Sequence, residues 1–268
     1  MGERSKTMLG VSYIRGYLLE DVRSKQLIEK QKEESKNIVE RINKANGGMF
    51  TRNIITRNFY FNEKIKENIY KFDQLLVLGI GLDTKADALE ELKDKKVFGL
   101  DINANSIHGI YEEAGLKTNA VILPVDLRNV SKEDILKKLI EQGFSLEERT
   151  YMIWEGGTFY IKESEVLDIL SFWYDSVNIR GMSIDFLNYD VFHDKTHKSR
   201  EVIEMVLKIL ENAKEPWIGY FRPENITTYF RSLGCKHIDL DMHGDIERKI
   251  YDEPLVIEDL LFFVTVFD

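Results

Sequence analysis

Two glycines and an aspartate have the residue types and the spacing of a nucleotide-binding turn. Gly79 and Gly81 follow the apolar run 75–78, which is typical of a buried strand. Glycine lets the backbone turn sharply and approach a ligand closely. A second apolar run ends at Asp101, twenty residues after Gly81, where a carboxylate can accept hydrogen bonds from ribose hydroxyls. These residues predict the binding of a nucleoside.

The same turn favours one kind of nucleoside cofactor over another. A dinucleotide fingerprint has a third glycine at the start of the helix, whose N-terminus binds the pyrophosphate of the ligand. This chain has Thr84 at that position. A nucleoside without a pyrophosphate needs only the first turn and the ribose acid. The turn therefore favours S-adenosylmethionine over NAD. A tight strand-to-helix turn of an ordinary α/β protein is the alternative interpretation.

Alternating strands and helices after residue 74 would position these groups. The expected strands span 75–78, 97–101, 120–124, 151–155, 182–187, 236–240 and 260–267, and the expected helices span 83–92, 104–114, 132–142, 163–173, 200–212 and 223–233. This alternation predicts an α/β fold with a seven-stranded, doubly wound, Rossmann-like sheet. Ligands of such sheets bind beyond the carboxyl ends of the strands, which is where Gly79, Asp101, Asp126 and Glu155 fall.

Composition excludes several other classes of protein. The chain has 268 residues, 43% of them hydrophobic, and a net charge of -9, which suits a large core and disfavours nucleic acid as a partner. A single cysteine, Cys235, excludes an internal disulfide. No apolar run is long enough to span a membrane, so we expect a cytoplasmic protein that binds no membrane.

Metal binding is not expected. His193 and His197 lie four residues apart, which would place them on one face of a helix, but no glutamate stands between them as in the zinc-protease motif.

Several motifs resemble those of the leucine carboxyl methyltransferase-like group of class I S-adenosylmethionine (SAM) methyltransferases. They occur in the family's order from about residue 52 to 240. The segments that carry the resemblance are LGIGLDT at 78–84 (family LGAGLDT), Asp101 (EVD), DLR at 126–128, WEGGTFYI at 154–161 (EGLLMYL), Arg57 with Phe59 and Phe61 (RTRFFD), and EPW at 215–217. The chain departs from the family at Lys85, Gly99 and Asn62, where the family has arginine, glutamate and aspartate.

The resemblance implies roles for the residues of the donor site. Arg57 would pair with the methionine carboxylate of SAM, since a guanidinium binds a carboxylate at two points. Gly79 and Gly81 would pass under the methionine part, and Asp101 would hold the ribose. As alternatives, Arg57 would be a surface arginine on an amphipathic helix and Asp101 a polar strand end.

The remaining roles concern adenine, the amino group and the acceptor. Asp126 and Leu127 would flank the adenine, unless Asp126 only caps a helix. Glu155 would bind the amino group of SAM, or else form a buried ion pair with a protein cation. Tyr160 would position the acceptor oxygen, or else be an aromatic core residue.

The resemblance also implies an activity, namely transfer of a methyl group to oxygen with S-adenosylhomocysteine as product. A carboxylate of a small molecule is the acceptor we favour, since it is ionised at neutral pH and needs no base. An enol or hydroxyl acceptor would ask for a base such as His193 or His197. Alternatives are a protein C-terminal carboxyl methyltransferase and a non-catalytic SAM-binding protein. We expect a monomer or homodimer.

The N-terminal segment is expected to be a helical extension. Helical patterns cover 11–46, ended by Gly47 and Gly48, and 52–70. We predict an extension or lid at 1–72, with Tyr13, Arg15 and Tyr17 near the cofactor, and a compact methyltransferase domain at 73–268.

Overall fold

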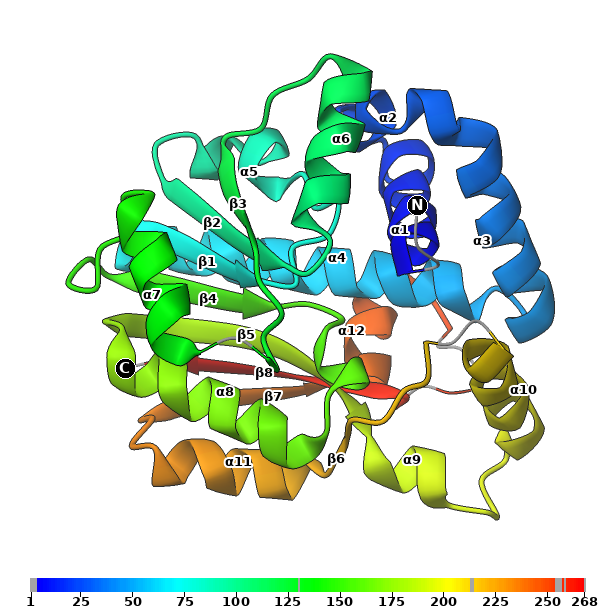
Figure 1. Ribbon diagram of the computed structural model, residues 1–268. Helices are drawn as coiled ribbons and strands as arrows, with labels where there is room; N and C mark the ends of the chain where they lie inside the picture. Colours follow the sequence, from blue (N-terminus) through cyan, green and yellow to red (C-terminus); the bar gives the residue numbers. More distant parts are fainter. Residues whose placement is uncertain (1–3, 130, 213–214, 254–256, 258, 268) are drawn as a thin grey trace. The chain divides into compact units, whose positions relative to one another are not determined.

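The computed structural model describes residues 4–129, 131–212, 215–253, 257 and 259–267 (Figure 1). These residues form two compact units, of which the first comprises 1–69 and 74–144 and the second 70–73 and 145–268. The predicted division at residue 72 stays a prediction, and residues 1–3, 130, 213–214, 254–256, 258 and 268 of the predicted domains lie outside the described residues.

The first unit holds three parallel strands, β1 (Gln74–Leu78), β2 (Lys96–Asp101) and β3 (Ala120–Pro124), with β2 in the middle. Every residue of β1 is buried. Helix α6 (Ala104–Ala114) connects β2 to β3 and packs on β3, and α7 (Lys132–Glu141) follows. Because the strands are parallel, Gly79, Asp101 and Asp126 all lie at or just beyond the carboxyl ends of strands, on one edge of this sheet.

The connection between β1 and β2 differs from the prediction. A helix over 83–92 was expected, but α5 covers only Lys85–Ala88 and a single 3-10 turn covers Glu90–Leu92. Leu89 is extended (φ -88°, ψ 114°), so the chain turns there and buries Leu92. The helix beside the glycine turn is therefore one turn long.

The N-terminal segment forms α1 (Arg4–Leu18), α2 (Val22–Leu27), a 3-10 turn (Glu29–Gln31), α3 (Lys32–Asn46), α4 (Met49–Asn68) and a second 3-10 turn (Ile69–Lys71). The predicted single helix over 11–46 is wrong. The chain reverses at Glu20, whose φ is 57°, and Asp21 caps a new helix. Gly47 ends α3 in the left-handed conformation, as predicted.

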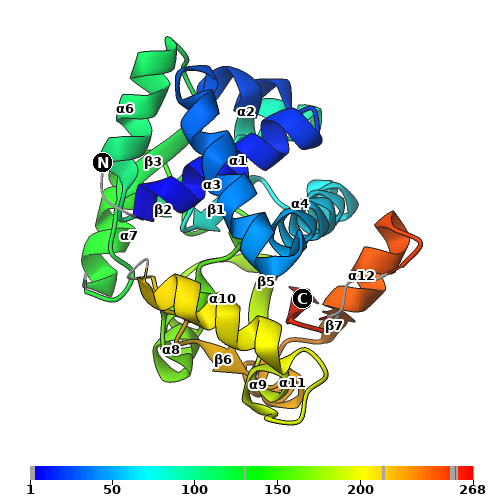
Figure 2. The same cartoon turned by 90° about the vertical axis from the view of Figure 1, so that its right-hand side faces the viewer.

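The N-terminal helices pack against one another within this unit. Figure 2 shows α1, α3 and α4 side by side, and their contacts are direct. Ile14, Val39 and Ile54 meet in a buried apolar cluster. These helices therefore contribute a core of their own to the unit that carries the glycine turn.

The second unit holds β4 (Thr150–Trp154), β5 (Ile179–Asn188), β8 (Leu261–Phe267) and β7 (His237–Met242), in that spatial order, with β6 (Tyr220–Phe221) also beside β5. Strands β4, β5 and β6 are parallel, whereas β8 runs antiparallel to both β5 and β7. The helices of this unit are α8 (Glu163–Ser176), α9 (Tyr189–His193), α10 (Arg200–Asn212), α11 (Pro223–Ser232) and α12 (His243–Ile250).

The α/β fold class is confirmed, and a strand occurs at each of the predicted positions. The short elements β6, α9 and α12 were not predicted. No helix in the described part of the chain is long and apolar enough to cross a membrane.

Candidate functional site

The glycine turn exposes its backbone at the carboxyl end of β1. Gly79 and Gly81 both have left-handed conformations, with φ of 67° and 56°. The N–H of Gly79 donates to the carbonyl of Leu100 on β2 at 2.7 Å. A Cβ atom built on Gly79 would meet nothing within 4 Å. The turn therefore combines a required glycine conformation with open space beside the backbone.

Asp101 is held against this turn by two backbone hydrogen bonds. Its Oδ2 accepts from the N–H of Gly81 at 2.8 Å, and its Oδ1 accepts from the N–H of Asn103 at 2.7 Å. The residue is only 7% exposed. A carboxylate has about four acceptor positions, so Asp101 can accept two further hydrogen bonds from a diol. The structure thus brings together the two residues whose spacing predicted a ribose site.

The departure from the family at Gly99 has a steric cause. A Cβ atom on Gly99 would lie 2.5 Å from Cδ1 of Ile80, the residue between the two glycines of the turn. A larger side chain at this position of β2 would therefore displace the side chain of Ile80.

Asp126 and Leu127 lie half-buried directly beyond β3. The N–H of Val125 donates to the carbonyl of Asp101 at 3.1 Å, which links this segment to β2. Burial acts to raise the pKa of Asp126, but hydrogen bonds from the Arg128 backbone and the Asn129 side chain outweigh it and hold the pKa below its usual value. Asp126 is therefore an ionised acceptor at the sheet edge.

Arg57 lies on α4 and is 8% exposed. The alternative of a surface arginine is therefore wrong. A buried guanidinium is costly unless acceptors offset the loss of water, which makes Arg57 a candidate for binding an anionic ligand group.

Side chains of α1 and α5 hold the segment after the glycine turn, and of these Ser12 was not predicted from the sequence. Ser12 of α1 donates through Oγ to the carbonyl of Leu82 at 3.4 Å. Arg15 Nη1 lies 3.2 Å from Asp83 Oδ2, and Lys85 Nζ lies 2.5 Å from the same oxygen. Lys85, which stands where the family has arginine, thus places a cation on Asp83.

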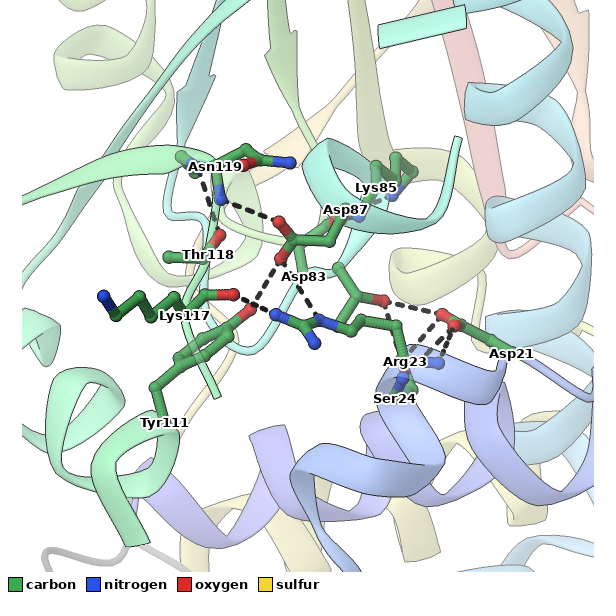
Figure 3. A network of polar contacts seen from close by, with 12 residues as sticks. Asp21, Arg23, Ser24, Asp83, Lys85, Asp87, Tyr111, Lys117, Thr118 and Asn119 are labelled. Atoms are coloured by element: carbon green, nitrogen blue, oxygen red, sulfur yellow. Dashed lines mark hydrogen bonds and ion pairs between the residues drawn. The ribbon is translucent and has the colours of Figure 1, made fainter. Parts of the chain in front are cut away.

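Helix α2 adds a polar network around α5 (Figure 3). Asp21 Oδ2 accepts from Thr84 Oγ1 at 2.6 Å. Asp87 Oδ1 accepts from the N–H of Asn119 at 2.7 Å, and Arg23 Nε lies 3.7 Å from Asp87 Oδ2. Buried Tyr111, beside Asp87, has a raised pKa, chiefly because of burial.

In the second unit, a buried aspartate holds the turn after β4 in the same way that Asp101 holds the glycine turn. Gly156 follows half-buried Glu155 and has a φ of 69°. Its N–H donates to Oδ1 of Asp185 on β5 at 2.7 Å. Thr158 Oγ1 donates to the carbonyl of Asp185 at 2.6 Å. Asp185 therefore positions the segment that carries Glu155.

Asp185 is a residue that sequence reasoning missed. It is fully buried in a strand whose neighbours are apolar. An acid within a buried apolar strand must have hydrogen-bond donors to be tolerated. An aspartate within the apolar run 182–187 could therefore have been recognised from the sequence as a residue that binds a nearby donor.

Replacing Asp185 by alanine is expected to lower the free energy of unfolding by about 1–3 kcal/mol, because the N–H of half-buried Gly156 loses its acceptor. Asparagine keeps an acceptor oxygen and should lose less. Urea denaturation of both variants measures the difference. Equal losses in the two variants would contradict a role based on this hydrogen bond.

Tyr160 ends the 3-10 turn Thr158–Tyr160 and is half-buried. Its neighbour Phe159 packs edge-on against Trp217, with ring centroids 5.6 Å apart. Trp217 contacts Phe192 at 5.8 Å, which in turn contacts Tyr220 at 5.1 Å. Tyr160 thus lies at one end of an aromatic row that consists of Phe159, Trp217, Phe192 and Tyr220.

The expected helix face shared by His193 and His197 is wrong, because α9 ends at His193 and Asp194 is extended. Backbone groups engage both rings. His193 Nδ1 lies 2.9 Å from the carbonyl of Tyr189, and His197 Nδ1 accepts from the N–H of Ser199 at 3.1 Å. Among the described residues, no group of three or more His, Cys, Asp or Glu could hold a metal ion.

Comparison with known proteins gives a family match and a fold match. Residues 10–173 match the family model "Leucine carboxyl methyltransferase". No curated protein sequence matches the chain. A Thermobifida fusca YX protein named as a candidate methyltransferase is 16% identical, with a TM-score of 0.63 over 91% of this chain and 92% of its own.

A second solved structure, a duf574 family protein from Streptomyces avermitilis MA-4680, is 11% identical. Its TM-score is 0.57, and the match covers 98% of this chain and 97% of that one. At these identities the likeness concerns the fold alone.

Proposed function

Because the chain belongs to the leucine carboxyl methyltransferase family, we propose that it transfers a methyl group from SAM to the carboxylate of a small molecule. The chain is a SAM-dependent methyltransferase with the class I fold. The observation that carries the site assignment is the hydrogen bond from the Gly81 N–H to Asp101. It joins the family's glycine motif to its ribose acid.

The residues of the first unit fit the cofactor. Gly79 offers backbone next to open space, and Asp101 has acceptor capacity left for a diol. Asp126 would accept from the exocyclic amine of adenine, with Leu127 as an apolar wall. Buried Arg57 would pair with the methionine carboxylate. The role of Glu155 in binding the amino group stays a prediction from the family resemblance. When bound, SAM supplies a methyl group activated by the sulfonium charge.

The acceptor is proposed to be a carboxylate because such a group is already ionised at neutral pH. The chain then has to orient the acceptor and exclude water rather than remove a proton. Tyr160 would orient the acceptor oxygen through its hydroxyl. The aromatic row next to it offers apolar area for the rest of a small acid.

The reaction is tested with SAM labelled in the methyl group and a panel of small carboxylic acids, phenols and C-terminal peptides. We expect label in small acids, released as methanol by mild base, because esters hydrolyse and ethers do not. Calorimetry with SAM, S-adenosylhomocysteine and NAD measures donor binding separately.

Each of the other outcomes identifies a different error. Base-stable label in phenols would contradict a carboxylate acceptor, and label in peptides alone would contradict a small-molecule acceptor. SAM binding without transfer to any acceptor would contradict catalysis of this type. Binding of NAD without SAM would contradict the donor assignment.

A further inference from the structure

We propose that Asp21, at the corner between α1 and α2, is a positioning residue for the SAM site, because it holds Thr84 and with it the glycine turn. This inference rests on the proposed assignment of Gly79, Gly81 and Asp101 as the donor site. It adds a residue to that site which does not itself touch the cofactor.

The glycine turn has little local support. It contains two glycines in the left-handed conformation, and the backbone of glycine is less restricted than that of any other residue type. Helix α5, which follows, spans only Lys85–Ala88, and one helical turn is not stable by itself. The conformation of residues 79–84 must therefore be stabilised by contacts with other elements.

Asp21 supplies one of these contacts, the hydrogen bond with Thr84, and its other three hydrogen bonds fix its carboxylate at the start of α2. Its Oδ2 accepts from Thr84 Oγ1 at 2.6 Å and from Ser24 Oγ at 2.8 Å. Its Oδ1 accepts from the N–H groups of Arg23 and Ser24 at 2.9 and 3.1 Å. Thr84 and Ser24 are at most 1% exposed. Hydrogen bonds to an ionised acceptor in such a setting are stronger than neutral ones.

The corner that carries Asp21 is itself fixed. Glu20 is the one non-glycine residue in the described part of the chain with a positive φ. A Cβ atom on Gly16 would lie 2.7 Å from the backbone nitrogen of Lys25, so α1 and α2 are in close contact. Asp21 is therefore a rigid attachment point for Thr84 rather than a flexible surface group.

The attachment extends to the ribose acid through a short segment. Gly81, three residues before Thr84, donates to Asp101. Releasing Thr84 would let this segment move and would separate the Gly81 N–H from the carboxylate. The expected consequence is weaker cofactor binding and faster opening of the turn.

Thr84→Val tests the inference because valine keeps the shape and removes only the hydroxyl. We expect the Kd for SAM to rise by about three- to tenfold, less than the roughly 13- to 160-fold equivalent of one hydrogen bond to a charged group, because the lost bond acts on the cofactor only through the turn. Thr84→Ser keeps the hydroxyl and should bind SAM with a Kd within about twofold of that of the original chain. In the protein without SAM, amide exchange over residues 79–85 should be faster in Thr84→Val.

Arg23→Met is the matched control. Arg23 also joins α2 to α5, but its side chain reaches Asp87 and the carbonyl of Lys117, which lie outside residues 79–84. It should lower stability and leave the Kd within about twofold. In a double-mutant cycle, Asp21→Ala and Thr84→Val together should weaken binding no more than Asp21→Ala alone.

Thr84→Val with unchanged affinity would overturn the inference, and so would equal losses in Thr84→Val and Arg23→Met, which would indicate general loosening of α2. If Asp101→Ala also binds SAM normally, the donor-site assignment itself has failed. If Thr84→Val binds SAM normally and Asp101→Ala does not, the donor-site assignment stands and only the positioning role of Asp21 is contradicted.

Discussion

Replacing Asp101 by alanine is expected to weaken SAM binding by at least about tenfold, equivalent to about 1.4 kcal/mol or more. Two effects add. The ribose loses a charged acceptor, and hydrogen bonds to charged groups are worth about 1.5–3 kcal/mol each. The N–H groups of Gly81 and Asn103 also lose the carboxylate that orients them. Calorimetric titration with SAM measures the loss directly.

Asp87→Ala is the matched control for this prediction. Asp87 is also a nearly buried carboxylate that accepts from a backbone N–H, that of Asn119. It lies on α5 rather than at a strand end. We expect Asp87→Ala to lower thermal stability and to leave the Kd for SAM near its original value. Wild-type affinity in Asp101→Ala would refute the ribose assignment.

The strands and the residues that follow them could be predicted because their signals are local. Short apolar runs between glycines and charged residues indicate buried parallel strands, and 120–124 and 104–114 coincide with β3 and α6. Parallel strands end at one edge, so Gly81 and Asp101 could be expected to meet, and they are joined by a hydrogen bond.

The supports of the site could not be predicted because they join residues distant in sequence. Asp21 and Thr84 are separated by 63 residues, and no periodic pattern links them. The same network accompanies the shortening of the helix expected over 83–92. The side chain of Asp87 accepts a hydrogen bond from Asn119 and pairs with Arg23, and the chain turns at Leu89 instead of continuing as a helix. Helix propensity is a local property of the sequence and does not predict these tertiary contacts.

The N-terminal helices illustrate the same limit. An amphipathic pattern over 11–46 predicts helix but not where the helix breaks. Asp21 is a residue type that often begins a helix, yet a helical pattern continues on both sides of it. The reversal at Glu20 becomes evident only from the packing of Gly16 against Lys25.

Removal of residues 1–44 is expected to abolish cooperative folding of the unit, rather than to uncover the cofactor as loss of a lid would. Helices α1 and α2 and the residue after them bury Leu9, Ile14, Leu27 and Ile28, each at most 1% exposed. Full burial of one such side chain is worth about 1.5–3 kcal/mol. Four of them together approach the whole stability of a typical protein, about 5–15 kcal/mol.

Point variants on one helix separate folding from cofactor binding. Ile14 lies in the cluster with Val39 and Ile54, whereas Leu18, one turn later on α1, is 49% exposed. Ile14→Ala should lower the free energy of unfolding by about 2–5 kcal/mol, and Leu18→Ala by no more than about 0.5 kcal/mol. Urea denaturation followed by circular dichroism measures both.

A truncated chain that unfolds in one sharp transition and still binds SAM normally would show that the helices are dispensable. If it unfolded sharply but had lost SAM affinity, the helices would serve as a separable lid. Because α1 places Ser12 and Arg15 directly on residues 82 and 83, we expect neither result. The same helix packs the core of the first unit and holds the turn to which we assign the cofactor, so we expect removal of the helix to affect folding and binding together.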